Sequence, residues 1–138
     1  MTLHVAVDGA CWWNERGFGR FTRELVRALA ARSADADIRY TLVLETEQPT
    51  DRELPVPPPG LEVRVAGTAP TGEVTSGSGA RSPGHLLRMG RALAAVDADI
   101  VFFPAIYSWV PLPAPTPTVV TIHDAIPERF PRLVFPTR

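Results

Sequence analysis

The stretch TVVTIHD at residues 118–124 decides the fold, because an unbroken run of apolar and β-branched residues ends there in two polar side chains. Such a run is typical of a buried strand in a parallel sheet. His123 and Asp124 would then stand at the carboxyl end of that strand, followed by a proline-braced loop at residues 125–131. Open α/β sheets bind their ligands at the carboxyl ends of the strands. The sequence therefore predicts that both side chains lie beside a cleft at this edge.

Four other segments are apolar enough to form strands, namely residues 3–7, 40–44, 61–65 and 100–103. With two helical stretches among them, the predicted order is β-α-β-β-α-β-β. This order is typical of an α/β fold with a parallel sheet covered by helices on both faces. Right-handed crossovers favour the strand order 3-2-1-4-5. The loops after the first, fourth and fifth strands would then surround one crevice, where the strand order reverses.

The two helical stretches repeat apolar residues at helical spacing. The first runs from Arg20, and its predicted core face consists of Phe21, Leu25, Val26 and Leu29. The second begins with Ser82 as its N-cap and Pro83 as its first helical residue. Its predicted core face consists of Leu86, Met89, Leu93 and Val96. The intervening residues 67–84 are rich in Gly, Ser, Thr and Pro, and we expect them to be mobile.

Composition is that of an ordinary globular domain. The 138 residues are 45% hydrophobic and 21% charged, and the net charge of −1 argues against nucleic acid or an anionic membrane as a partner. Cys11 is the only cysteine, so no intrachain disulfide is possible, which fits the reducing cytoplasm. No apolar run approaches the length of a membrane span. The three histidines are scattered without the spacing of metal ligands, so we expect no metal site.

Gly17-Phe18-Gly19-Arg20 is the first candidate binding motif, because it opens the first predicted helix. Glycines allow a ligand to approach the backbone, and a helix N-terminus offers free N–H groups to an anion. Arg20 could add a two-pronged contact to a phosphate or carboxylate. Alternatively, the motif is a glycine-rich turn with a solvated arginine. It is not a dinucleotide fingerprint, since Thr22 occupies the position of the third glycine.

His123 and Asp124 are the candidate catalytic residues. A histidine at a strand end could act as a general base or bind a sugar hydroxyl, and the aspartate could orient it or bind substrate. Alternatively, His123 satisfies backbone groups at the strand end and Asp124 caps the next turn. A Ser-His-Asp triad is not supported, because the chain has no nucleophile elbow. Cys11 is interpreted as a small buried residue rather than a nucleophile.

Four aromatic residues lie in predicted loops, namely Trp12, Trp13, Tyr107 and Trp109. Exposed aromatic rings beside a cleft suit contact with a sugar or a lipid. Alternatively, they pack locally within their loops or against a partner domain. Tyr107 and Trp109 follow the predicted strand at residues 100–103, so we assign them as candidate substrate-binding residues.

Four motifs occur in order along the chain: VAVDG at 5–9, GFGRFTREL at 17–25, DIVFFP at 99–104 and VVTIHDAIP at 119–127. Phe130 and Pro131 follow the last of them. In this order and spacing, the motifs resemble the N-terminal domain of retaining GT-B glycosyltransferases of the group 1, or family four, type. The resemblance covers the chain from end to end.

The resemblance implies that residues 1–138 form a Rossmann-like, acceptor-side glycosyltransferase domain that is incomplete at its C-terminus. It implies hexose transfer from a nucleotide sugar to an unknown acceptor, without metal or cofactor. Gly17 and Gly19 would approach the donor diphosphate and sugar, and Arg20 would begin the helix behind them. His123 would contact the transferred sugar, and Asp124 would shape the acceptor side.

The chain lacks the C-terminal domain in which this family binds most of the donor. We therefore expect the fragment alone to be inactive, and the resemblance is compatible with membrane association of the whole enzyme. One alternative is a non-catalytic Rossmann-like module that binds a carbohydrate or a protein. Another is a fragment of a dinucleotide-binding oxidoreductase, against which the missing third glycine argues.

Overall fold

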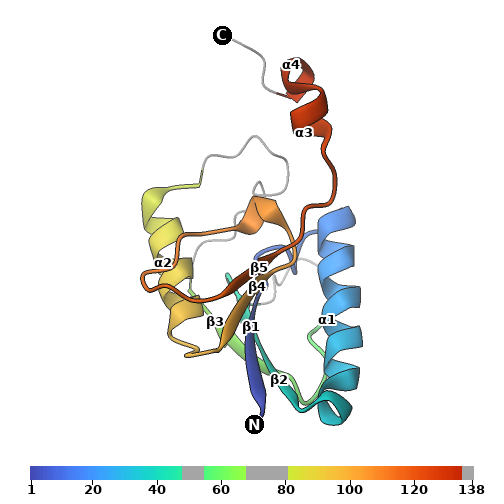
Figure 1. Ribbon diagram of the computed structural model, residues 1–138, viewed down its shortest axis with the longest axis vertical. Helices are drawn as coiled ribbons and strands as arrows, with labels where there is room; N and C mark the ends of the chain where they lie inside the picture. Colours follow the sequence, from blue (N-terminus) through green and yellow to red (C-terminus); the bar gives the residue numbers. More distant parts are fainter. Residues whose placement is uncertain (48–54, 68–80, 135–138) are drawn as a thin grey trace.

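Five parallel strands form one sheet in the order β3-β2-β1-β4-β5 (Figure 1). The computed structural model describes residues 1–47, 55–67 and 81–134. The strands are β1 (Leu3–Asp8), β2 (Ile38–Leu44), β3 (Glu62–Val65), β4 (Ile100–Phe103) and β5 (Thr118–Val120). The predicted α/β class and the predicted strand order are both confirmed. The order reverses between β1 and β4, so the loops that follow β1, β4 and β5 share one edge of the sheet.

Two long helices cover opposite faces of the sheet, α1 (Gly17–Ala36) and α2 (Pro83–Ala94) (Figure 1). Three short helices follow β4 and β5: η1 (Ile106–Ser108), α3 (Ile126–Arg129) and α4 (Pro131–Val134). α3 and α4 extend beyond the edge of the sheet, away from its two layers of helix (Figure 1). No helix in the described part of the chain is long and apolar enough to cross a membrane.

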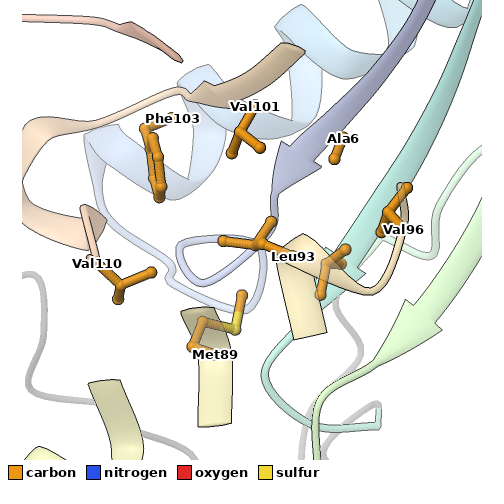
Figure 2. Packing of buried hydrophobic residues seen from close by; sticks show 8 residues of the cluster. Ala6, Met89, Leu93, Val96, Val101, Phe103 and Val110 are labelled. Carbon is orange, nitrogen blue, oxygen red and sulfur yellow. The ribbon is translucent and has the colours of Figure 1, made fainter. Parts of the chain in front are cut away.

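The core is divided into two clusters by the sheet. Along β1, Val5 and Val7 point to the cluster under α1, whereas Ala6 points to the cluster under α2. Figure 2 shows the second cluster, in which Met89 and Leu93 of α2 pack toward the strands. Because both faces of β1 are covered, its central residues 5–7 are all apolar instead of alternating with polar ones.

The start of α2 follows the prediction. Ser82 Oγ accepts a hydrogen bond from His85 N at 3.2 Å, and Pro83 is the first helical residue. This arrangement is typical of a helix N-terminus. The cap accepts a hydrogen bond from an amide that has no partner within the helix, and proline has no N–H group that would need one. Most of the stretch expected to be mobile, residues 68–80, lies outside the described residues.

The last strand differs from its prediction in both length and burial. β5 ends at Val120, and Val119 is 51% and Ile122 72% exposed. β5 is the edge strand of the described sheet, where helical cover is thin. The amide of Thr121 still donates to Phe103 O, and its carbonyl oxygen accepts from Ile106 N. The chain then leaves the sheet. The predicted buried strand over residues 118–122 is therefore wrong: it is a short, exposed edge strand.

The first helix also differs from its prediction, since it begins at Gly17 rather than at Arg20. Val26 is buried as expected, but Phe21 is 37% exposed. Phe21 lies against a side chain from the segment after β5 instead of the core. Helical spacing alone could not separate these two environments, because both favour an apolar residue.

Candidate functional site

Three segments meet at the carboxyl edge of the sheet through one group of rings, Phe18, Phe21, Tyr107 and His123, which we call the aromatic cluster. The His123 ring lies edge-on to Phe18 and Phe21 of α1, with centroid distances of 5.1 and 4.6 Å. The Tyr107 ring of η1 contacts Phe18 at 5.2 Å. Figure 1 shows the segment after β5 passing the N-terminal end of α1. The loops that the strand order predicts to surround one crevice are therefore in contact.

The His123 ring is oriented by a backbone carbonyl. Its Nε2 lies 2.9 Å from Pro104 O, at the end of β4. A carbonyl oxygen only accepts, so Nε2 carries the proton and the Nδ1 of a neutral ring is an acceptor. Among the described residues no side chain or backbone group is bonded to Nδ1. His123 thus satisfies a strand-end carbonyl and also presents an acceptor at an exposed position.

Asp124 is directed elsewhere. Its Oδ1 accepts a hydrogen bond from Ile126 N at 3.0 Å, which places the carboxylate at the start of α3. This is the turn-capping arrangement expected of an aspartate before a short helix. Asp124 and His123 are neighbours in sequence but have different partners, and no bond joins them among the described contacts.

The two glycines of the GFGR motif lie in different surroundings. A Cβ on Gly19 would lie 1.8 Å from Asn14 O and 2.8 Å from Cys11 O, so the loop before α1 requires glycine there. A Cβ on Gly17 would meet nothing within 4 Å. Gly17 therefore leaves the N-terminus of α1 open, whereas Gly19 allows close packing of the loop.

Arg20 and Arg23 of α1 occupy contrasting positions. Arg20 is exposed, and its side chain makes no hydrogen bond or ion pair within the described residues. The buried Arg23 donates from Nη1 to Trp12 O and to Asn14 O, at 2.5 and 2.8 Å. Arg20 is thus available to a ligand, while Arg23 holds the loop that precedes the helix.

The loop aromatics divide into packed and exposed residues. Trp12 is fully buried, and its Nε1 donates to Pro55 O at 3.0 Å. Trp13 Nε1 donates to Thr46 O at 3.1 Å. A role in sugar or lipid contact is therefore wrong for Trp12, because local packing removes it from the surface. Tyr107 is half-buried in the aromatic cluster, and Trp109 is 45% exposed.

A second set of polar residues at this edge was missed by the sequence analysis. Asp8, Glu45 and His85 are all buried, and we call them the buried polar group. His85 Nε2 lies 3.0 Å from Glu45 Oε1. Burial lowers the pKa of His85, and the charges of Arg81 and Arg88 act in the same direction.

Asp8 has the most perturbed environment of this group. Burial raises its pKa from 3.8 to about 6, although Ser108, the Ala10 amide and the Arg81 charge all oppose the rise. Ala10 N donates to Oδ1 at 3.2 Å, but Oδ2 has no hydrogen-bond partner among the described residues. The hydroxyl of the neighbouring Ser108 also lies 2.9 Å from Ala105 O, and its single proton serves only one of these two acceptors at a time.

Signals for the buried polar group were present in the sequence. Asp8 and Glu45 are the first charged residues at the ends of apolar strands, which is the argument that selected His123. His85 lies one helical turn before Met89, on the buried face of α2. The signal was weak because these residues come from three separate segments.

The described residues contain no group of three or more side chains suited to holding a metal ion. Burial raises the pKa of the Cys11 thiol to about 12, so the thiol stays protonated. The interpretation of Cys11 as a small buried residue is confirmed. The chemistry available at this edge is therefore an imidazole acceptor, an open helix N-terminus, a guanidinium and exposed rings.

The comparisons with known proteins assign no family to this edge of the sheet. No protein-family model, curated protein or solved structure matches the chain.

Proposed function

We propose that this chain is the N-terminal, acceptor-side domain of a retaining GT-B glycosyltransferase, which transfers a hexose from a nucleotide sugar to an acceptor. One observation carries the proposal. Three of the four motif segments of the resemblance meet where His123 contacts Phe18 and Phe21 of α1 and Pro104 O at the end of β4. They are distant in sequence, and a shared ligand at this edge explains why the segments at 17–25 and 119–127 carry glycine or polar residues here.

In this proposal the groups at the edge have separate roles. The Nδ1 atom of His123 accepts a hydrogen bond from a hydroxyl of the transferred sugar, while Nε2 keeps the ring in place. The open N-terminus of α1 at Gly17 and the guanidinium of Arg20 face the anionic donor. The ring of Trp109 offers a stacking surface for a sugar, and Tyr107 borders it.

Asp124 shapes the acceptor side through the turn that it caps at the start of α3. The donor nucleotide is held mainly by a second domain, which the proposal requires. No metal ion or cofactor takes part in the proposed reaction.

A second candidate function is a non-catalytic module that binds a carbohydrate or a protein. One observation favours it: Nε2 of His123 and Oδ1 of Asp124 both have backbone partners, so each residue has a structural role of its own. The two functions differ in whether a donor is consumed.

The experiment is donor turnover by the natural full-length protein, with its intact mass measured beside it. UDP-, GDP- and ADP-hexoses are supplied one at a time, and release of nucleoside diphosphate is followed. We expect release with one donor and a mass above the 15.0 kDa of this chain. No release with any donor, together with a native mass of 15.0 kDa, would contradict the enzyme and favour the binding module.

A further inference from the structure

Arg81, just before α2, binds the turn that carries the two candidate sugar-contacting rings. Its Nη1 donates to Ser108 O at 3.0 Å, and its Nη2 donates to Tyr107 O at 3.1 Å and to Trp109 O at 2.5 Å. Three consecutive carbonyl oxygens at the end of η1 thus share one guanidinium. Arg81 precedes α2 and its carbonyl partners follow β4, so this contact joins the start of α2 to the loop after β4.

The chemistry of this contact is specific to arginine. The last carbonyls of a helical turn have no partners within the turn, and they carry a partial negative charge. A planar guanidinium offers several N–H donors in a fixed fork, whereas an ammonium offers a compact point charge. In Arg81 the three carbonyls are served from two separate nitrogens, Nη1 and Nη2, whereas an ammonium would have to serve all three from a single nitrogen.

The carboxylate of Asp8 lies near the same turn. Ser108 is fully buried, and its side chain lies beside Asp8. Burial raises the pKa of Asp8, and the nearby positive charge of Arg81 partly offsets that rise. The turn is therefore bonded to a guanidinium and has a buried carboxyl group beside it. On its outer side, the Tyr107 ring rests on Phe18, which also contacts His123.

We infer that Arg81 is a positioning residue that fixes the turn at residues 107–109, and through it the places of Tyr107 and Trp109 in the sugar site. The role in substrate binding rests on the proposed function, whereas the role in holding the turn does not. Arg81 itself touches no substrate in this account.

The test compares Arg81→Ala and Arg81→Lys with the control Arg91→Ala, an exposed arginine in the last turn of α2. Amide hydrogen exchange is measured in the full-length protein at Ser108 and Trp109, whose amides donate to Ala105 O and Ile106 O within η1. We expect exchange at these two amides to rise about tenfold or more in both Arg81 variants. Amides of β1 and β2 should keep their protection, and Arg91→Ala should change neither set.

The lysine variant separates geometry from charge. It keeps the positive charge near Asp8 but loses the fork, so we expect it not to restore protection of the turn. Unchanged exchange in Arg81→Ala, or full protection in Arg81→Lys, would overturn the inference. If Arg81→Ala fails to fold, the comparison rests on Arg81→Lys.

Steady-state kinetics provide a second test of the role of Arg81. If the full-length protein turns over a donor, we expect the Arg81 variants to raise KM by about tenfold with a smaller change in kcat, because contacts to the sugar are displaced while His123 remains in place. A loss of kcat with unchanged KM would contradict the assigned effect on binding. A wild-type protein without turnover would defeat the proposed function and leave the exchange result to decide the role of Arg81.

Discussion

Two sets of side chains share the carboxyl edge of this sheet and differ in their access to solvent. The buried polar group, Asp8, Glu45 and His85, lies at the ends of β1 and β2 and on α2. The aromatic cluster lies on the other side of β1, where η1 and the segment after β5 meet α1. The comparison teaches that polar residues at a strand end need not serve a ligand. Those under α2 are buried in the fold, whereas His123, beside the exposed edge strand, is accessible to a ligand.

The contrast between positions that the fold requires and positions that are open to a ligand is tested most sharply at the two glycines of α1. Gly19→Ala places a methyl group against Asn14 O and Cys11 O, and we expect a loss of about 4 kcal/mol or more in unfolding free energy. Gly17→Ala meets open space, so we expect stability to be unchanged or raised by up to about 1 kcal/mol. Urea unfolding of both variants measures the difference. Equal stabilities would mean that the loop before α1 moves freely, against the packing described here.

The next effect concerns Asp8. The folded protein binds the Asp8 proton more tightly, with a pKa of about 6 against an ordinary 3.8, so stability falls as pH rises through this window and stays lower above it. The difference between these pKa values corresponds to about 3 kcal/mol at most. Asp8→Asn should therefore be the more stable protein at pH 7.5, by up to that amount, and should lose this part of the pH dependence.

Unfolding midpoints of the two proteins between pH 4 and 8 measure the effect. The lowered pKa of His85 makes stability fall as pH decreases, but His85 is present in both proteins and cancels in their difference. If Asp8→Asn is less stable than the wild type at pH 7.5, the carboxylate has a favourable partner that this account lacks.

A smaller contrast is expected from two arginines one turn apart on α1. Arg23→Ala leaves Trp12 O and Asn14 O without their shared donor, and we expect a loss of about 2 kcal/mol. Arg20→Ala removes an exposed side chain and should stay within about 0.5 kcal/mol of the wild type. Thermal unfolding measures both. A loss of similar size in Arg20→Ala would show that its side chain has a structural role and is not held free for a ligand.

Much of the architecture could be predicted because strand order depends on few rules. The apolar runs around Val5 and Val101 marked buried strands, and right-handed crossovers left one simple order. That order placed His123 near the start of α1, although the strand before it proved shorter and more exposed. The capped start of α2 at Ser82 was equally visible, since its cue is local.

The remainder depended on contacts between distant segments. Phe21 fits a core face by spacing but lies against His123, and Trp12 sits in a loop yet is fully buried. The two glycines look alike in sequence, and only the position of Asn14 O distinguishes Gly19 from Gly17. The buried polar group was missed because its members are single residues in separate elements, and burial is a property of the assembled fold.

The measurement that tests the central claim most directly is made on His123→Ala in the full-length protein, with donor turnover and unfolding free energy determined on the same sample. Within the described residues the exposed side chain makes one hydrogen bond and two ring contacts, with Phe18 and Phe21, so we expect a stability loss of about 2 kcal/mol or less. We expect turnover to fall by about 100-fold or more, as for loss of a group that acts on the reacting sugar. Normal turnover in this variant, with the fold intact, would contradict the role assigned to His123 and to this edge of the sheet.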